Sequence, residues 1–185
     1  MTRLADLDPA TMTDAQKEVF DAIASGPRKG VRGPLAVWLH RPELARQAQA
    51  LGRYCRYDSS LPPRLSELAI LVLASVWQAE YEWYAHKPIA LEAGIDPAAV
   101  EAIRTGATPV FRQADEEIVH RFVVELHRER RVSNATYAQA VALLGEGRVV
   151  DLVGIAGYYT LISMTINVFE VTPPAGVAPE LGTAA

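Results

Sequence analysis

Residues 64–95 read RLSELAILVLASVWQAEYEWYAHKPIALEAGI, an apolar run in which Glu67, Glu82 and His86 are embedded. A carboxylate or imidazole that leaves water for such surroundings needs a partner or a neutral form, and either outcome shifts its pKa. Groups with shifted pKa values are candidates for proton-transfer chemistry. We therefore expect this segment to form the core of the fold and to hold a buried acid–base site.

Helical periodicity determines which of these three side chains can meet. Glu82 and His86 are four residues apart, so they lie on one face of a helix, one turn from each other. Glu67 precedes Glu82 by about four helical turns, so it reaches them only if the segment bends or splits. Because a helix of about thirty residues is long for a globular protein, we expect one helix to end near Gln78 and another to begin around Ala79 to Glu82. Such a break folds Glu67 back toward His86.

Simpler roles are open for the same residues. By spacing alone, Glu82 and His86 are explained equally well as an ordinary intrahelical pair at the edge of the core. Glu67 is also explained as a helix-surface charge beside Arg64, three residues earlier. Cys55 is typical of a small buried residue rather than of a nucleophile.

Helix signals dominate the rest of the chain, and strand signals are scarce. The apolar segment 149–168 is long enough to cross a membrane, but polar side chains interrupt it, which favours a helix buried against the domain or a partner subunit. A loop at 26–33, rich in glycine, proline and basic residues, is the expected lid. These signals predict an all-α protein of seven or eight helices. Caps or first-turn prolines mark further helix starts at Thr13 (with Gln16), Pro42, Asp96, Asp115 or just before it, and Ser133.

Length and composition predict a single domain that spans residues 1–185. Its core is expected at about 35–170, and an irregular tail is expected at 172–185. The chain has 185 residues, of which 50% are hydrophobic, so one sizeable core is expected. Its net charge of -4 gives no electrostatic reason to expect nucleic acid or a membrane surface as a partner. The N-terminal residues lack a signal-peptide pattern and Cys55 is the single cysteine, so we expect the cytoplasm as its compartment.

The central segment resembles the carboxymuconolactone decarboxylase and alkylhydroperoxidase D superfamily. The peroxidase branch spaces its residues as Glu-x11-Cys-x2-Cys-x3-His, and these places are Glu67, Ala79, Glu82 and His86 in this chain. The glutamate and the histidine match, and both cysteines are absent. The EYEWYAH sequence at 80–86, with GPLAVWLHRPELA at 33–45 and ISMTINVFEV at 162–171, resembles the cysteine-poor branch usually called carboxymuconolactone decarboxylase-like.

This resemblance implies an alkylhydroperoxidase-D-like helical bundle that assembles as a trimer or hexamer. It also implies a decarboxylase that acts on a small carboxylated lactone, without a metal or an organic cofactor. In that reaction His86 is the general acid, Glu82 orients its ring, and Glu67 completes a proton relay. The substrate carboxylates require a cation. The candidates for binding the substrate are Arg64, Lys87, Arg53 and Tyr81.

Other functions are open as well. A hydroperoxide reductase needs the cysteine pair that Ala79 and Glu82 replace. A non-catalytic oligomer that binds a small ligand retains the fold without turnover. The same Glu and His pair also suits isomerisation, hydration or ring closure, so the sequence leaves the substrate open. His120 and His127 lie seven residues apart on one helix, but the surrounding charged residues favour a solvated face, and we predict no metal site.

Overall fold

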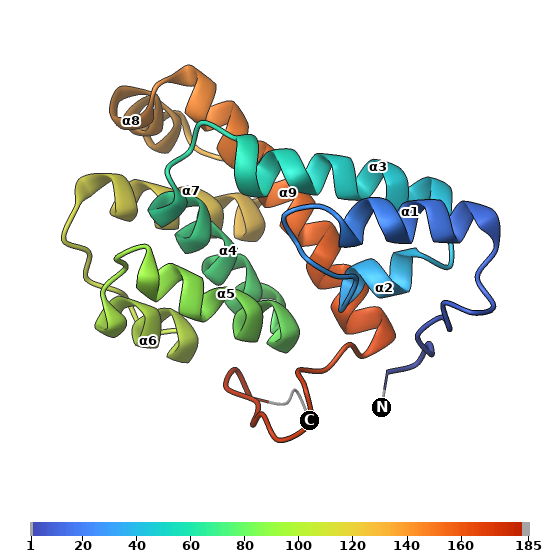
Figure 1. The fold of residues 1–185 in the computed structure, drawn as a ribbon. Coiled ribbons are helices and arrows are strands. Elements are labelled where there is room, and N and C mark those ends of the chain that lie inside the picture. The colour runs from blue at the N-terminus through green and yellow to red at the C-terminus, as the bar shows by residue number, and fades with distance from the viewer. Residues whose placement is uncertain (1, 183–185) are drawn as a thin grey trace.

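The computed structural model describes residues 2–182, and the regular secondary structure in this range is helical (Figure 1). The expectation of an all-α fold is confirmed. The described residues form nine α-helices, more than the seven or eight expected. In chain order the elements are α1 (Asp14–Ala24), α2 (Pro34–Trp38), α3 (Pro42–Arg53), the π-helical turn η1 (Tyr54–Asp58), α4 (Pro63–Trp77), α5 (Glu80–Glu92), α6 (Pro97–Thr105), α7 (Ala114–Glu129), α8 (Asn134–Leu144) and α9 (Glu146–Phe169).

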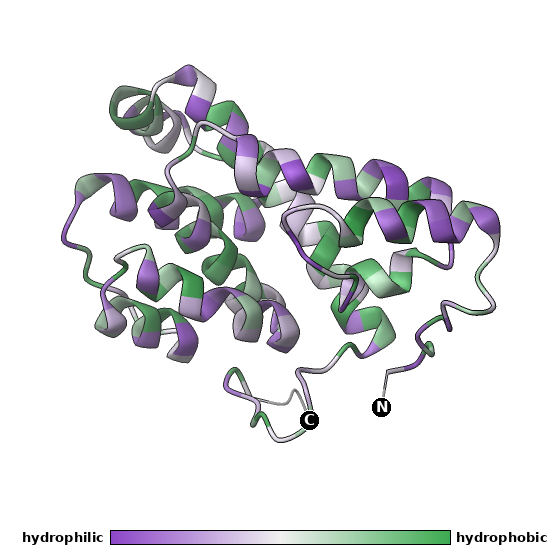
Figure 2. Cartoon of the chain, in the orientation of Figure 1, coloured by the Kyte–Doolittle hydropathy of each residue, from purple (hydrophilic) through white to green (hydrophobic). Residues whose placement is uncertain are grey.

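Helix α4 is the central element of the fold. Every residue from Leu65 to Ala74 is buried, because α4 packs against α5, α7 and α9. Figure 2 shows this helix as mainly apolar, whereas the outer helices carry hydrophilic residues on their exposed sides. A helix that is apolar nearly all round must be enclosed by other elements. Buried apolar residues from all nine described helices accordingly join one continuous core around α4.

The expected break within residues 64–95 is confirmed. Helix α4 ends at Trp77, Gln78 adopts a left-handed conformation with φ 52° and ψ 41°, and α5 begins at Glu80. The side-chain amide of Gln78 donates a hydrogen bond of 2.7 Å to the carbonyl oxygen of Ser75, which satisfies one of the last acceptors of α4. The chain reverses at this point and lays α5 along α4 (Figure 1).

The predicted helix starts are also found. The Thr13 and Gln16 capping box is complete, and the side chains of Asp96 and Ser133 accept backbone hydrogen bonds at the starts of α6 and α8. Helix α7 begins at Ala114 with Gln113 at its N-cap position and no side-chain cap, so Asp115 lies inside the first turn and only the approximate start of this helix was predicted. The caps therefore placed the starts of α1, α6 and α8 correctly from local chemistry.

The helix that starts at Pro42 ends differently from a regular helix, because α3 runs into the π-helical turn η1. Asp151 of α9 holds the end of this turn. One of its oxygens accepts from the Tyr54 hydroxyl at 2.6 Å, and the other accepts from the backbone amide and hydroxyl of Ser60 at 2.7 and 2.6 Å. This buried aspartate thus fixes η1 against α9.

Helix α9 and the tail complete the fold. By length and composition α9 is the described helix that could cross a membrane, but 61% of its most apolar window is buried inside the structure, as expected for a core helix. Residues 172–182 of the predicted tail contain no helix and are attached to α5, whereas residues 183–185 of that prediction lie outside the described range. Glu180 accepts from the Trp83 indole at 3.1 Å and from Lys87 at 2.5 Å, and Glu80 accepts from the backbone amides of Glu180 and Leu181.

Candidate active site

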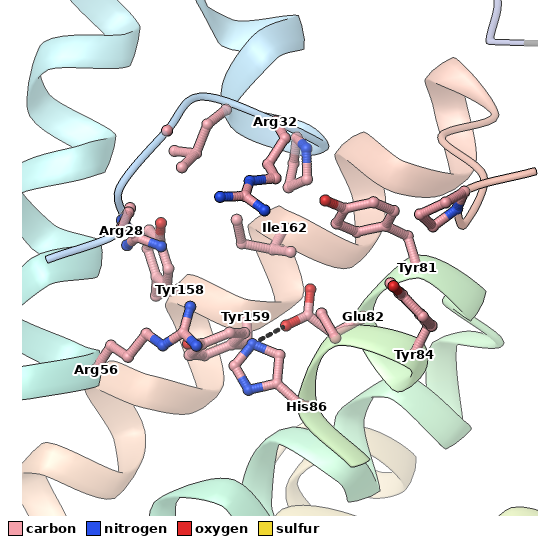
Figure 3. Close-up of a pocket in the computed structure, with 15 residues that line it drawn as sticks. Arg28, Arg32, Arg56, Tyr81, Glu82, Tyr84, His86, Tyr158, Tyr159 and Ile162 are labelled. Atoms are coloured by element: carbon pink, nitrogen blue, oxygen red, sulfur yellow. Dashed lines mark ion pairs between the residues drawn. The ribbon is translucent and has the colours of Figure 1, made fainter. Parts of the chain in front are cut away.

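A cavity of about 350 Å³ lies between α5, α9, η1 and the loop that precedes α2 (Figure 3). Residues of all four elements line it, and Pro174 of the tail contributes to its wall. The loop at 26–33, which we expected to form a lid, contributes Arg28, Gly30 and Arg32. The cavity therefore combines side chains that are far apart in the sequence.

Glu67, His86 and Glu82 form one line of contacts beside this cavity. Oε2 of Glu67 lies 2.6 Å from Nδ1 of His86, and Oε1 of Glu82 lies 3.2 Å from Nε2 of the same ring (Figure 3, dashed line for the second pair). The three residues are only 5%, 4% and 2% exposed, in that order. His86 and Glu82 line the cavity, whereas Glu67 lies behind the ring on α4. The break at Gln78 thus brings together the three residues that the sequence singled out.

The contacts differ from the expected roles in one respect. We expected Glu82 to orient the imidazole and Glu67 to act further along a relay. The shorter contact is instead between Glu67 and Nδ1, on the side of the ring away from the cavity. With Glu67 as the acceptor, Nδ1 carries the hydrogen and Nε2 faces Glu82. Glu67 therefore fixes the ring and its tautomer, and Glu82 is the carboxyl group that meets the cavity.

Burial strongly shifts the pKa of the Glu82 carboxyl. It raises the pKa of this carboxyl from 4.5 to about 7, while the charges of His86 and Arg56 oppose part of the rise. A group with a pKa near 7 is about half protonated at neutral pH, which suits a general acid or base. The Glu82 carboxyl therefore lines the cavity with a pKa near neutral and lies 3.2 Å from Nε2 of His86.

Tyrosine side chains form much of the remaining wall. The Tyr159 ring meets the His86 ring edge to face, with 5.2 Å between centroids, and Tyr158 meets Tyr159 in the same way. Burial raises the pKa of Tyr158 to about 12 and that of Tyr159 well above its usual value, so both keep their phenolic hydrogens. Tyr81, a candidate for binding the substrate, does line the cavity.

Three arginines of the cavity were not identified from the sequence. Arg28 and Arg32 come from the loop, and Arg56 comes from η1 (Figure 3). None of the three forms an ion pair with another residue of the described range 2–182. Arg28 and Arg56 both approach the ring of Tyr57, at 6.0 and 5.4 Å from its centroid. The concentration of basic residues in one loop of an acidic chain was the available signal for these residues.

The cations that we considered from the sequence lie elsewhere, which corrects that expectation. Arg64 forms ion pairs of 2.7 Å with Asp115 and 2.6 Å with Glu116. Lys87 is bound to Glu180 in the tail, and Arg53 is 64% exposed and lies 3.4 Å from Asp58. None of Arg64, Lys87 and Arg53 lines the cavity. Carboxylates on α7, η1 and the tail engage these cations, and those on α7 and the tail are too distant in the sequence to be identified from a local pattern.

His120, His127 and Cys55 lie outside the cavity and contact residues other than Glu67, His86 and Glu82. His127 contacts the Val123 carbonyl and the Thr160 hydroxyl, both at 2.9 Å, and the His120 ring lies against Phe111. Within residues 2–182 there is no group of three histidine, cysteine or acidic side chains placed to hold a metal ion. Cys55 is 1% exposed, and burial raises the pKa of its thiol to about 11, which keeps it protonated and unreactive at neutral pH.

Comparison with known proteins finds a family match over part of the chain and a shared fold over most of it. Residues 42–117 match the Carboxymuconolactone decarboxylase family. A comparison with curated proteins gave no significant match.

Three solved structures share the fold over nearly the whole chain. An uncharacterized peroxidase-related protein from Silicibacter sp. TM1040 has 15% identity and a TM-score of 0.74, with 94% of this chain and 92% of that chain covered. The alkylhydroperoxidase AhpD core protein from Ralstonia eutropha JMP134 has 14% identity and a TM-score of 0.76, with 94% and 93% covered. The debrominase Bmp8, in complex with 2,3,4-tribromopyrrole, has 14% identity and a TM-score of 0.73, with 95% and 93% covered. At these identities the likeness establishes an alkylhydroperoxidase-D-like fold and no more.

Proposed function

We propose that this chain, whose residues 42–117 match the Carboxymuconolactone decarboxylase family, is an acid–base enzyme acting on a small carboxylated lactone or a related intermediate of aromatic degradation. One observation carries the proposal. A buried Glu67–His86–Glu82 line opens onto a cavity that is lined by arginines without carboxylate partners. This combination provides a proton donor and a cationic site in the same enclosed space.

The proposed reaction is a decarboxylation. The bond between a ring carbon and its carboxylate breaks, carbon dioxide leaves, and the electron pair moves into the ring toward the lactone carbonyl. A carbon of the resulting dienolate then takes a proton from the Glu82 and His86 pair, which regains one from solvent. An enclosed cavity favours the first step because the carboxylate loses hydration there. A positioned acid with a pKa near the working pH favours the second step.

Each member of the line has a distinct role in this proposal. Glu82 and Nε2 of His86 share the proton that reaches the substrate, and they are the catalytic residues. Glu67 does not line the cavity, so it acts as a positioning residue that holds Nδ1 at 2.6 Å. Tyr159 packs edge to face against the imidazole and limits rotation of the ring.

The charge of the cavity supports an anionic substrate. The chain as a whole has a net charge of -4, yet this cavity holds Arg28, Arg32 and Arg56. Partly desolvated positive charges attract an anion far more strongly than exposed ones do. A volume of about 350 Å³ also suits a small ring compound. The debrominase Bmp8, which shares the fold, was solved with the small ring compound 2,3,4-tribromopyrrole.

Peroxide reduction is the less favoured activity for this chain. Ala79 and Glu82 stand where the peroxidase branch has its two cysteines, and the single cysteine, Cys55, is buried with a raised thiol pKa. A non-catalytic binding protein is the remaining alternative, because the cationic cavity alone is sufficient to hold an anion.

The ultraviolet progress curve with 4-carboxymuconolactone tests the proposal. We expect wild-type protein to turn over and the His86→Ala variant to lose at least a hundredfold in kcat while it keeps its substrate affinity, since loss of an acid–base group costs roughly that factor. The Glu92→Gln variant is the control, because Glu92 is an exposed residue of the same helix. Binding without turnover by the wild-type protein would support the binding-protein alternative instead.

A further inference from the structure

Gly52 of α3 leaves a notch in the wall of the cavity, and two polar groups occupy it. A Cβ atom at this position would lie 2.1 Å from the hydroxyl oxygen of Tyr158 and 2.7 Å from Nη2 of Arg28. Both distances are too short for any side chain, so a glycine is required here for the two groups to lie against the helix. The phenol of α9 and the guanidinium of the loop therefore meet at one point of the wall (Figure 3).

These two groups are buried and lack further partners. Apart from each other, neither the Tyr158 hydroxyl nor Nη2 of Arg28 has a hydrogen-bond partner within residues 2–182, and Arg28 is the one group near enough to act on the Tyr158 oxygen as a donor, which leaves the phenolic hydrogen free. Tyr158 is 2% exposed, and both residues line the cavity. Buried donors are nearly always hydrogen-bonded in folded proteins, because an unpaired one loses its contacts with water and gains nothing. Two such donors side by side indicate a site for an acceptor.

The charge and protonation of the groups indicate which acceptor fits. Arg28 is a permanent cation, and Arg56 also lines the cavity, with both guanidinium groups near the ring of Tyr57. Burial raises the pKa of Tyr158 to about 12, so this hydroxyl remains a donor at neutral pH. The two oxygens of a carboxylate match one phenolic and one guanidinium donor.

We propose that the Tyr158 hydroxyl and the Arg28 guanidinium, seated in the notch at Gly52, form an oxyanion-binding subsite that holds a carboxylate of the ligand. The assignment rests on the proposed function only in taking that carboxylate as part of the substrate. In this subsite Arg28 is the cation that binds the substrate carboxylate, a residue that the sequence did not identify. Gly52 is a positioning residue, because it leaves room for Arg28 and Tyr158. It also anchors the substrate on the α3 and η1 side of the cavity, in reach of the Glu82 and His86 pair.

Calorimetric titration with benzoate, and with benzamide as its neutral analogue, tests the subsite. We expect benzoate to bind and benzamide to bind at least tenfold more weakly. Tyr158→Phe and Arg28→Met should each weaken benzoate binding by about tenfold or more, as is usual for the loss of a hydrogen bond to a charged group. Arg53→Met is the control, because it removes the same charge from an exposed residue on α3 that does not line the cavity.

The thermal stability of the variants distinguishes a ligand-binding role of Tyr158 from a purely structural one. Tyr158→Phe removes a buried hydroxyl whose hydrogen has no partner, so its Tm should equal or exceed that of wild type while its benzoate affinity falls. Gly52→Ala should lower the benzoate affinity by displacing both donors, and Gly157→Ala, a helical glycine with open space around it, should not. Equal benzoate affinity in wild type, Tyr158→Phe and Arg28→Met would overturn the subsite, and so would equal binding of benzoate and benzamide or no binding of benzoate. Because none of these titrations requires turnover, failure of the subsite is distinct from failure of the decarboxylase proposal.

Discussion

At the scale of single residues, surroundings rather than residue type divide the work between two glutamates. Glu67 and Glu82 both contact the His86 ring, but only Glu82 faces the cavity. Burial raises the pKa of Glu82 to about 7, so this carboxyl is about half protonated at neutral pH. The contact on the opposite ring nitrogen leaves Glu67 with the task of orienting His86. The two ring nitrogens of His86 therefore have different surroundings. Nε2 faces Glu82 at the cavity, and Nδ1 contacts Glu67 on the side away from the cavity.

The raised pKa of Glu82 predicts a pH-dependent stability. The folded carboxyl has a pKa of about 7 and the unfolded one about 4.5, so the folded state binds more protons between these values. The free energy of unfolding should therefore fall as the pH rises from about 4.5 to about 7, by about 3 kcal/mol relative to a variant without this group. Urea unfolding of wild type and Glu82→Gln at pH 5 and pH 8 measures the difference.

The control for this experiment is Glu92→Gln, which removes an exposed carboxylate from the same helix. Its stability should follow that of wild type at both pH values. If the Glu82→Gln and wild-type curves stay parallel, Glu82 has an ordinary pKa and the acid–base assignment is wrong.

The sequence identified the three residues of the line but not the cations around them. Four-residue spacing and the break at Gln78 were enough to predict that Glu67, Glu82 and His86 meet, since both are properties of one continuous segment. Arg28 and Arg56 lie in other segments, and only the packing of the loop and η1 against α9 brings them to the cavity. Arg64 was one of three candidate cations, with Lys87 and Arg53, but Asp115 and Glu116 of α7 engage it.

At the scale of elements, the segment before α2 shapes the mouth of the cavity. Gly33 ends this loop with φ 61° and ψ -136°, a conformation that side chains disfavour, and a Cβ there would lie 2.4 Å from the Tyr81 ring. The glycine thus allows the loop to pass close to α5. The loop residues and Tyr81 hold one another in place around the cavity.

Substitution of Gly33 tests this close approach. Gly33→Ala should lower the free energy of unfolding by roughly 2–3 kcal/mol, since it combines backbone strain with displacement of Tyr81. Gly106→Ala is the matched control, because Gly106 has a φ of 71° with nothing near its Cβ position, and it should cost only about 1 kcal/mol. Chemical denaturation of both variants gives the comparison. Equal losses would mean that Tyr81 moves freely and does not fix the loop.

Most element boundaries followed from local chemistry, and the exceptions have physical reasons. Thr13, Asp96 and Ser133 cap their helices as predicted, because a cap depends on residues only a few positions apart. Helix α2 was missed because five residues are too few to show a helical period. The π-helical turn η1 depends on Asp151 of α9, nearly a hundred residues away, so no local pattern reveals it.

At the scale of the whole molecule, one side of α9 lines the cavity and another side carries exposed apolar residues. One side carries Tyr158, Tyr159 and Ile162 into the cavity. The other side leaves large apolar residues in contact with solvent, and they recur at helical spacing. These exposed residues are Val150, Val153, Leu161, Met164 and Val168, between 37% and 71% exposed. A stripe of this kind is typical of a surface that is covered in an oligomer.

We therefore expect the protein to form trimers or hexamers through this stripe of α9. Light scattering coupled to size exclusion should give a mass of three or six chains for wild type. Met164→Asp should reduce it toward one chain, because an aspartate at a covered apolar contact loses its hydration. Tyr137→Asp, on the exposed face of α8, is the control and should leave the mass unchanged. A monomeric wild-type protein would contradict the expectation.

The central claim is that the buried Glu82 and His86 pair holds a proton at neutral pH, and infrared spectroscopy of the protein tests this most directly without any substrate. A protonated carboxyl has a carbonyl stretching band that disappears when the group ionises. In wild type we expect such a band to titrate with a midpoint at about pH 7, to be absent from Glu82→Gln, and to persist in Glu92→Gln. A wild-type spectrum with no carboxyl band that titrates near neutral pH would contradict the claim.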